Sequence, residues 1–576
     1  MANLLRALCL LPLLFSFAQP SFLFPDPLGG ESGESNDNNN NNEENDRLYE
    51  TDYRGEWELV VENSGVSGMH LVLFPNNKAI MFDASELGPS KLRLPRGNCR
   101  KIPPAKGKPG GTDCWAHSLE FDIETSEIRP LKVETDPWCS AGGLDAEGKL
   151  VNSGGWFLGG KVMRYLEPCD DCDWREYPTA LSGGRWYATQ VILADGEFVV
   201  IGGRKMFSYE FVPREGQSNR GNFYLPLLDE TTDISENNLY PFVHLSTDGN
   251  LFVFANSRSI LLNPIRNKVI REFPVLGGGS RNYPASGMSA LLPIKLEGEN
   301  PEVIPAEVIV CGGNTPEAFR SADKEGKMLP ALEDCGRIMI TERDAEWKIE
   351  QMPSPRVMGD MLILPTGDLL LLNGAKKGTA GWKFGDDPNL VPVIYKPQRP
   401  INKRFKELAA STIPRMYHSS SAVLPDGRIL VAGSNTNNRY TFEGVKFPTE
   451  LRVEKFSPPY LDPSLAEHKP EINEVSSENK ITYGQRFLIQ FNLGEFKLEQ
   501  PDIEVTMYRP PFTTHGYSMD QRLLRLAIID LTQILPGIFN IVALAPPSGE
   551  IAPPGYYLVF VVHQGVPSRA MWLQIK

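Results

Sequence analysis

The chain has 576 residues, more than one ordinary domain, and 41% of them are hydrophobic, as in a folded globular protein. The formal net charge of −14 argues against a nucleic-acid partner, because a polyphosphate backbone binds cationic surfaces. Glycine and proline are frequent, with 51 and 48 residues, which favours many short strands joined by turns.

Residues 1–18 have the features of a secretory signal. Arg6 supplies a positive charge, residues 7–17 are apolar, and Ser16 and Ala18 are small enough to precede a cleavage site. The apolar run is too short to cross a bilayer, although a membrane anchor is the alternative, and no later stretch is long enough to span one. The sequence therefore predicts a secreted, extracellular protein with no membrane partner, located in the apoplast or cell wall if the source is a plant.

Residues 19–48 form a low-complexity segment, and between Asn36 and Asp46 it consists of Asn, Asp and Glu. Such a composition cannot bury enough apolar surface to fold, so we expect this segment to be disordered. The sequence contains no Asn-x-Ser/Thr sequon, and N-glycosylation is not expected.

The cysteines divide into possible pairs and one remainder. Cys9 lies in the predicted signal, and secretion favours disulfides among the others. Three pairs are close in the sequence, although spacing does not prove connectivity: Cys99 with Cys114, Cys169 with Cys172, and Cys311 with Cys335. Cys169-Asp-Asp-Cys172 could instead suggest zinc or redox work, but it lacks a second cysteine pair or a nearby histidine. Cys139 is left over, either as a reactive thiol or as a buried free one.

Residues 49–460 repeat a short unit about every 45 to 70 residues. Each unit contains an apolar strand that usually ends in glycine, at residues 79–83, 150–155, 198–203, 251–255, 308–313, 369–374 and 429–433. This kelch-like spacing, with seven units, predicts an all-β, seven-bladed β-propeller.

The repeat places reactive side chains at equivalent positions. Nine residues before the turn glycine of five of the units, the chain carries Cys139, Tyr187, Tyr240, Met358 and His418. Equivalent positions of a radial repeat face the same axis, so Cys139, Tyr187 and His418 are predicted to lie near one another, with Tyr417 beside the last.

Tyr417 and His418 are neighbours in the sequence, just before an apolar run that leads to the Asp426-Gly427 turn. In a regular strand their side chains would point to opposite faces. They can share one metal only if they come just before the strand, where the chain enters it irregularly, and Pro414 favours such an entry.

Residues 468–576 change in character and predict a second all-β domain. Its expected strands are residues 481–491, 503–508, 523–529, 539–544 and 556–562. This number of strands in a domain of this size fits an immunoglobulin-like sandwich. His515 lies in a loop among small and polar residues, where the alternative to a ligand is an exposed histidine.

Four motifs, in this order, resemble those of the copper-radical oxidases, and within them the glyoxal oxidases, especially the plant aldehyde oxidases of that type. They are Trp138-Cys-Ser-Ala-Gly, Gly184-Arg-Trp-Tyr, Arg415-Met-Tyr-His-Ser and Thr514-His-Gly-Tyr-Ser-Met-Asp-Gln-Arg. Each is weak alone, but together, on a propeller followed by an early-set immunoglobulin-like domain, they are specific.

The resemblance implies one Cu(2+) per chain. Tyr187, Tyr417, His418 and His515 would be its ligands, and Cys139 and Tyr187 would form a thioether-linked tyrosyl radical. Two imidazoles and two phenolates suit Cu(II), whereas ions that prefer oxygen would need carboxylates.

Two further residues are predicted on the substrate side of the site. Galactose oxidase stacks a tryptophan on the linked tyrosine from a loop that here reads Arg204-Lys-Met-Phe-Ser-Tyr, and Trp186 is the candidate substitute. Arg281 lies where family members have an arginine that contacts substrate, although a solvated loop arginine is the alternative.

The implied reaction oxidises a hydrated aldehyde, such as glyoxal or methylglyoxal, to the acid while O2 becomes H2O2. Tyr417 would act as general base and the Tyr187 radical would abstract hydrogen. One alternative is a galactose-oxidase-like primary alcohol oxidase that acts on sugars or wall polysaccharide, and another is a non-catalytic kelch propeller that binds a partner. The expected partners are a small aldehyde or alcohol and O2, with a peroxidase or other oxidant for activation, and we expect a monomer.

Overall fold

The structure is a computed structural model that describes residues 48–104, 109–494 and 498–576. The predicted signal sequence and nearly all of the predicted disordered segment lie outside these residues. Among the described residues, no helix is long and apolar enough to cross a membrane.

The described chain is built from β-strands, and its α-helical segments are single turns at α2 (Pro226–Glu230) and α3 (Ala318–Arg320). The all-β prediction is confirmed. Other helical turns are Ser85–Leu87, Phe157–Gly159, Ser321–Glu325, Ile401–Lys403, Pro459–Leu461, Pro463–His468, Glu474–Ser476 and Gln500–Asp502.

The first three repeats each form four antiparallel strands in one sheet. The first has β2 (His70–Leu73), β3 (Lys78–Phe82), β6 (Ser118–Asp122) and β7 (Ile128–Leu131). The second has β8 (Ala141–Leu144), β9 (Leu150–Ser153), β10 (Met163–Leu166) and β11 (Arg175–Tyr177). The third has β12 (Ala188–Ile192), β13 (Phe198–Gly202), β14 (Ser208–Phe211) and β15 (Phe223–Tyr224).

The next three repeats have the same arrangement. The fourth has β16 (Phe242–Leu245), β17 (Leu251–Ala255), β18 (Arg258–Asn263) and β19 (Lys268–Glu272). The fifth has β20 (Gly287–Leu291), β22 (Glu307–Gly312), β23 (Asp334–Met339) and β24 (Lys348–Gln351). The sixth has β25 (Asp360–Ile363), β26 (Leu369–Leu372), β29 (Val393–Tyr395) and β30 (Phe405–Glu407).

The last repeat joins the two ends of this region. It contains β31 (Ser419–Val423), β32 (Ile429–Gly433) and β33 (Val453–Ser457), and its outer strand is β1 (Glu56–Val61) from the beginning of the described chain. The described residues thus contain seven four-stranded units, the number that the repeat predicted. The predicted apolar strands are the second strands β3, β9, β13, β17, β22, β26 and β32.

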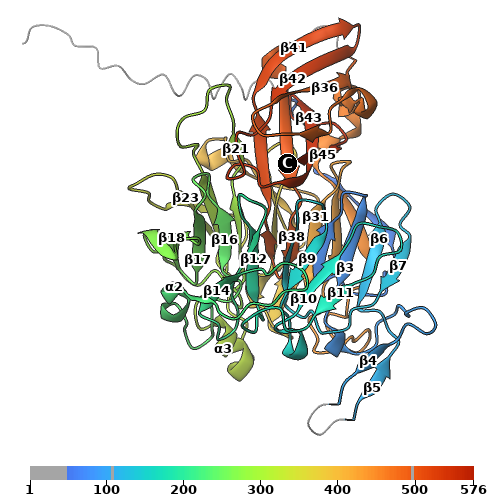
Figure 1. Ribbon diagram of the computed structural model, residues 1–576, viewed down its shortest axis with the longest axis vertical. Coiled ribbons are helices and arrows are strands. Elements are labelled where there is room, and N and C mark those ends of the chain that lie inside the picture. The colour runs from blue at the N-terminus through green and yellow to red at the C-terminus, as the bar shows by residue number, and fades with distance from the viewer. Residues whose placement is uncertain (1–47, 105–108, 495–497) are drawn as a thin grey trace, which may run out of the picture.

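The C-terminal region packs two sheets together above the repeats (Figure 1). One contains β21 (Ile294–Lys295), β40 (Arg522–Leu526), β37 (Ile503–Arg509), β43 (Gly555–His563), β44 (Val566–Pro567), β45 (Met571–Ile575) and β35 (Lys480–Ile481). The other contains β34 (Glu471–Ile472), β36 (Arg486–Asn492), β42 (Ile538–Leu544) and β41 (Ile528–Leu535). The expected strand at residues 523–529 is divided between β40 and β41, so the sequence prediction joined two strands of different sheets.

Three short hairpins complete the described chain. β38 (Phe512–Thr514) and β39 (Tyr517–Met519) extend the sheet of the first repeat by pairing with β2. β27 (Ala375–Gly378) pairs with β28 (Gly385–Pro388). β4 (Arg100–Ile102) and β5 (Gly111–Asp113) project from the body of the molecule (Figure 1).

The three cysteine pairs close in sequence form disulfides, as the spacing suggested. Cys169 and Cys172 are bonded to each other, which leaves no thiolate for a zinc site there. Cys139 is free and buried, unlike the other cysteines of the described chain.

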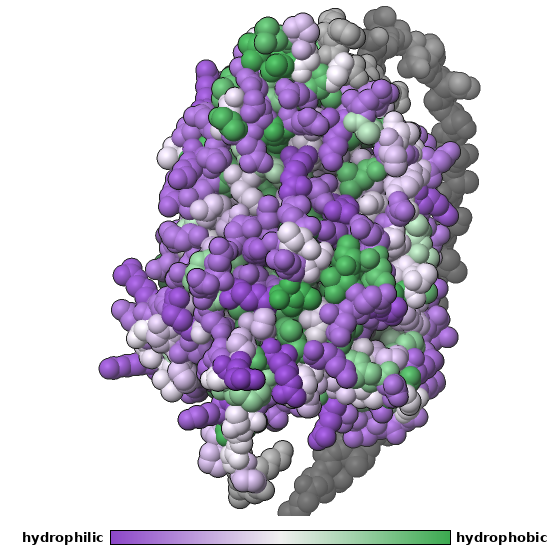
Figure 2. All heavy atoms as spheres, turned by 90° about the vertical axis from the view of Figure 1, so that its right-hand side faces the viewer, coloured by the Kyte–Doolittle hydropathy of each residue, from purple (hydrophilic) through white to green (hydrophobic). Residues whose placement is uncertain are grey.

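The face drawn in Figure 2 is mostly polar, with apolar side chains in separate patches. The apolar side chains of the second strands are buried between the sheets, where their removal from water stabilises the fold.

Candidate metal centre

The residues at the repeated position share an unusual backbone conformation. Cys139, Tyr187, Tyr240, Met358 and His418 all have a positive φ, between 47° and 65°. Residues other than glycine seldom adopt this left-handed conformation, so its recurrence at one repeat position shows that the five are structurally equivalent. Each comes one or two residues before the first strand of its unit.

Backbone hydrogen bonds join this position from one unit to the next. The N–H of Tyr187 donates to the carbonyl of Cys139 at 3.0 Å, and the N–H of Tyr240 donates to the carbonyl of Tyr187 at 2.9 Å. The side chains of Cys139 and Tyr187 are 0% and 5% exposed. The two residues are therefore held side by side, in adjacent units and away from water.

Tyr417 and His418 lie where the chain enters β31. The strand begins at Ser419, and His418 has a φ of +65°. Because this conformation interrupts the alternation of a strand, the two adjacent side chains are not forced to opposite faces. Their rings stack with centroids 3.8 Å apart. The predicted irregular strand entry is confirmed.

The C-terminal region contributes His515 on the hairpin of β38 and β39. His515 and Gly516 form its turn, and both have a positive φ, of +50° and +78°, as two-residue hairpin turns require. A Cβ on Gly516 would lie 2.6 Å from the carbonyl oxygen of Gly359, so no larger residue fits there. Thr514 pairs with His70 of β2, which joins this hairpin to the first repeat.

Three possible ligand atoms meet at this point. Those of Cys139, His418 and His515 all lie within 4.8 Å of one another, and the three residues are buried. The sulfur of Cys139 is 3.2 Å from Nε2 of His515, whose Nδ1 is 2.7 Å from Oγ1 of Thr514. The repeat arithmetic and the Thr514-His-Gly motif thus led to residues that the fold brings together.

The imidazole of His418 has the properties of a metal ligand. Its side chain is 1% exposed, and neither ring nitrogen has a hydrogen-bond partner among the described residues. Buried polar atoms are nearly always paired, so an imidazole left in this state fits a metal ligand.

Tyr187 and Tyr417, the two phenols predicted as ligands, have a third phenol between them that the sequence did not indicate. The hydroxyl oxygen of Tyr283 is 3.1 Å from that of Tyr187 and 2.8 Å from that of Tyr417. In the fifth repeat the strand-entry residue with positive φ is Ser286. Tyr283 comes three residues earlier, so counting back from a turn could not find it.

Burial sets the protonation of the site. It raises the pKa of Tyr187 and of Tyr417 well above the usual value, and neighbouring phenols and the Cys139 thiol add to both shifts. Burial also lowers the pKa of His418 and His515 well below the usual value. Two neutral imidazoles and two protonated phenols are therefore expected at neutral pH, and a cation would favour the phenolates.

Trp186 packs against Tyr187 with ring centroids 4.6 Å apart and an interplanar angle of 39°. It belongs to a group of half-buried tryptophans in mutual contact, the others being Trp138, Trp156 and Trp382. The guanidinium of Arg204 lies 5.4 Å from the centre of the Trp186 ring. Trp186 thus lies against Tyr187, the tyrosine for which the resemblance predicts a thioether.

Arg281 is buried, unlike the solvated loop arginine that was the alternative to a substrate contact. Its side chain is 0% exposed and forms an ion pair with Asp334 at 2.7 Å. The same guanidinium donates to the carbonyl of Gly312 at the end of β22, at 2.8 Å. This burial contradicts the alternative of a solvated loop arginine, and the contact with substrate stays a prediction.

The bond from Arg281 to Gly312 recurs in other repeats and explains the burial. Two more buried arginines donate to the glycine that ends the second strand, each at 2.8 Å, namely Arg185 to Gly202 and Arg415 to Gly433. Arg281 is therefore one of a repeated set that ties the entry of a repeat to the end of its second strand.

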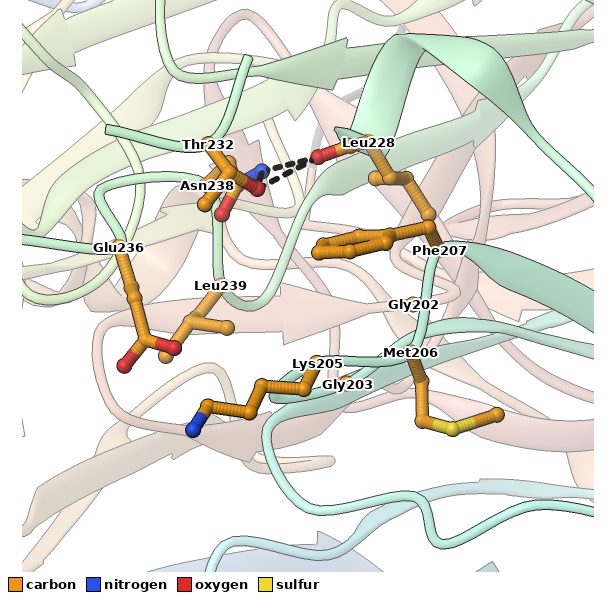
Figure 3. Close-up of a pocket in the computed structure, with 10 residues that line it drawn as sticks. All are labelled: Gly202, Gly203, Lys205, Met206, Phe207, Leu228, Thr232, Glu236, Asn238 and Leu239. Atoms are coloured by element: carbon orange, nitrogen blue, oxygen red, sulfur yellow. Dashed lines mark hydrogen bonds between the residues drawn. The ribbon is translucent and has the colours of Figure 1, made fainter. Parts of the chain in front are cut away.

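The loop that follows β13 in the third repeat lines one side of a small pocket (Figure 3). Its lining includes Gly203, Lys205, Met206, Glu236 and Leu239. Its lining includes neither Cys139 nor any of the four predicted copper ligands.

The fold and the cluster together define an all-β repeat protein with a buried site of imidazoles, phenols and a free thiol. Residues 69–460 match the family described as Glyoxal oxidase N-terminus, and residues 469–575 match Galactose oxidase-like, Early set domain. The chain belongs to the glyoxal oxidase family, an oxidoreductase family.

Relatives and one solved structure agree with this membership. The chain is 51% identical to Aldehyde oxidase GLOX1 of Arabidopsis thaliana, over 91% of this chain and 85% of that protein. It is 42% identical to Aldehyde oxidase GLOX of Vitis pseudoreticulata, over 91% of this chain and 98% of that one. A fungal alcohol oxidase of the AA5 family, solved in complex with copper, has the same fold, with a TM-score of 0.68, 17% identity and coverage of 91% and 100%.

Proposed function

We propose that this protein is a copper-dependent aldehyde oxidase that converts a hydrated aldehyde and O2 into a carboxylic acid and H2O2. The observation that carries the proposal is the buried, unpartnered imidazole of His418, next to a second imidazole and two phenols. The names of the relatives at 51% and 42% identity support an aldehyde as the substrate class.

Tyr187, Tyr417, His418 and His515 would hold one copper ion, since two imidazoles and two phenols suit Cu(II). Bound copper would supply one-electron redox chemistry for the two-electron oxidation, with O2 as the final acceptor of both electrons.

The protein's own groups perform the other steps. Oη of Tyr417 accepts the proton of the substrate hydroxyl, because a phenolate is a base within reach of the site. Oη of Tyr187, in its radical form, takes a hydrogen atom from the substrate carbon. Burial of both phenols keeps water from competing for either hydrogen.

Cys139 and Tyr187 would be joined by a thioether. One C–S bond forms between the sulfur and the tyrosine ring, and two hydrogens are lost to the oxidant, for which copper and O2 suffice. Their place in adjacent repeats, joined by a backbone hydrogen bond of 3.0 Å, supports this pairing. So does the state of Cys139, which is free while the other cysteines of the described chain are in disulfides.

The proposal extends to the location, oligomeric state, activation and domain bounds of the protein. The protein would be secreted and monomeric, and a peroxidase or another oxidant would convert it to its radical form. Its domains would span residues 49–460 and 468–576.

Mass spectrometry of the purified protein, before and after copper and O2, tests the proposal. We expect the Cys139 and Tyr187 peptides to become one species, lighter by two hydrogens than their sum. Peroxide release would then be measured with aldehydes and with the matching primary alcohols. A preference for alcohols would favour the galactose-oxidase-like alternative, and a protein that binds no copper would favour a binding propeller.

A further inference from the structure

Tyr283 lies in the loop between β19 and β20, and its hydroxyl group bridges the two phenols of the site. The oxygen is 3.1 Å from Oη of Tyr187 and 2.8 Å from Oη of Tyr417. A phenolic hydroxyl has one proton to donate and can accept in return, so one group can bond to both neighbours. The side chain is 8% exposed, which leaves little water to replace these bonds.

The ring of Tyr283 also lies against the ring of Tyr187. Their centroids are 4.5 Å apart with an interplanar angle of 29°, a stacked arrangement. Trp186 is at a similar distance, 4.6 Å, but is tilted by 39°. Of these two neighbours, Tyr283 presents the more parallel face to the linked tyrosine, and it alone adds a hydrogen bond to the phenol oxygen.

The loop that carries Tyr283 is held on both sides. The carbonyl of Tyr283 accepts from the N–H of Leu239 at 3.2 Å, and the carbonyl of Pro284 accepts from the N–H of Ala380 at 2.8 Å. Arg281, two residues earlier, is fixed by its buried ion pair with Asp334. The hydroxyl therefore has a defined place rather than a range of positions.

We infer that Tyr283 is a positioning residue of this site: its hydroxyl, which has one proton to donate, holds the oxygen of Tyr187 in place, and its ring supports the radical form of Tyr187. This inference rests on the proposed function. A radical phenol has lost its own proton and can only accept, so the neighbouring hydroxyl of Tyr283 is the group placed to donate to it.

Two variants separate the hydroxyl from the ring. Tyr283→Phe removes the hydroxyl and keeps the stacked ring. Tyr283→Leu removes the hydroxyl and the aromatic ring. Tyr240→Phe is the matched control, because Tyr240 is also buried and touches the Tyr187 ring edge-on, with centroids 5.6 Å apart. Its hydroxyl donates instead to the carbonyl of Ser140 at 3.0 Å.

The measurement is the half-life of the radical form after oxidation with hexacyanoferrate(III), followed by its optical and EPR signals. We expect Tyr283→Phe to shorten the half-life about fivefold, the factor for one net hydrogen bond. Tyr283→Leu should shorten it about 20-fold, because an aromatic contact is also lost. Tyr240→Phe should remain within about twofold of the parent protein. All variants should bind one copper and form the thioether, since both ligand phenols and Cys139 are unchanged.

The outcomes distinguish two kinds of failure. If the parent protein forms no thioether, the proposed function fails and this inference fails with it. If the parent protein forms the thioether and its radical, but Tyr283→Phe leaves the half-life unchanged, only the inference is overturned. It is also overturned if Tyr240→Phe has the same effect, because the cause would then be general loosening. Melting temperatures confirm that each variant is folded.

Discussion

The second, third and seventh repeats place chemically reactive side chains at the same backbone position where the fourth, fifth and sixth repeats place others. The first group has Cys139, Tyr187 and His418, and the second has Tyr240, Ser286 and Met358, all with positive φ. The backbone is alike in the two groups, and a tyrosine occurs in both. The repeat therefore supplies equivalent positions, and the side chain together with its hydrogen-bond partners distinguishes them: the hydroxyl of Tyr187 lies beside Tyr283, whereas that of Tyr240 donates to the carbonyl of Ser140.

A second contrast lies between the residues placed by the repeat and those placed by insertions. His515 lies in the turn of the β38–β39 hairpin, which comes from the C-terminal region. Tyr283 lies in the loop before β20, three residues before Ser286, the strand-entry residue of the fifth repeat. The site is complete only when these two meet the repeat-borne residues.

The largest effect on the rate of aldehyde oxidation is expected at Cys139, compared with the equivalent position Met358. Cys139→Ser cannot form the thioether, and we expect aldehyde oxidation to fall on the order of a thousandfold, about 4 kcal/mol of activation free energy. Met358→Leu, a volume-conserving change at an equivalent position, should alter the rate by less than about threefold. Rates are measured as peroxide release at saturating copper. Full activity of Cys139→Ser would contradict the radical mechanism.

Removing either histidine tests whether repeat-borne and hairpin-borne ligands act together. His418→Ala and His515→Ala should each weaken copper binding at least about 100-fold, because each removes one ligand. The control is His244→Gln, since His244 is a buried histidine whose Nε2 already has Oγ of Ser289 as partner at 2.8 Å. Metal titration gives the affinities. Unchanged copper affinity in His515→Ala would mean that the hairpin only packs against the repeats.

Copper affinity should rise with pH, because the metal displaces protons from phenols and not from imidazoles. Burial raises the pKa of Tyr187 and Tyr417, so both are protonated before binding, while the lowered pKa of His418 and His515 leaves them neutral. About two protons should leave per copper, and the affinity should rise about 100-fold per pH unit near neutrality. Calorimetry in buffers of different ionisation enthalpy counts these protons. Release of none would exclude both phenols as ligands.

The smallest effect on turnover is expected at Arg281. Arg281→Gln removes the ion pair with Asp334 and should lower the free energy of unfolding by roughly 2–4 kcal/mol, because the guanidinium is fully buried. The KM for aldehyde should change less than about threefold, because we expect the substitution to remove no contact with the substrate. Thermal unfolding and steady-state kinetics give the two values. A raised KM with unchanged stability would restore Arg281 as a substrate contact.

The sequence predicted those parts of the site that follow from local spacing. The distance from strand entry to turn glycine is a property of one hairpin, so counting nine residues back located Cys139, Tyr187 and His418. The three disulfides also joined cysteines that are close in the chain. The same local reasoning joined β40 to the start of β41, because a single run of apolar residues does not show where a chain changes sheets.

By itself, the sequence determined which residues carry reactive groups and which positions of the repeat they occupy, because strand and turn periodicities are local. Only the tertiary structure decided that Tyr283 bridges two phenols and that Arg281 is buried against Asp334. It also decided that β38 pairs with β2, residues from opposite ends of the chain. These contacts depend on which distant strands and loops pack together, and that choice is made by the burial of the whole core rather than by any segment alone.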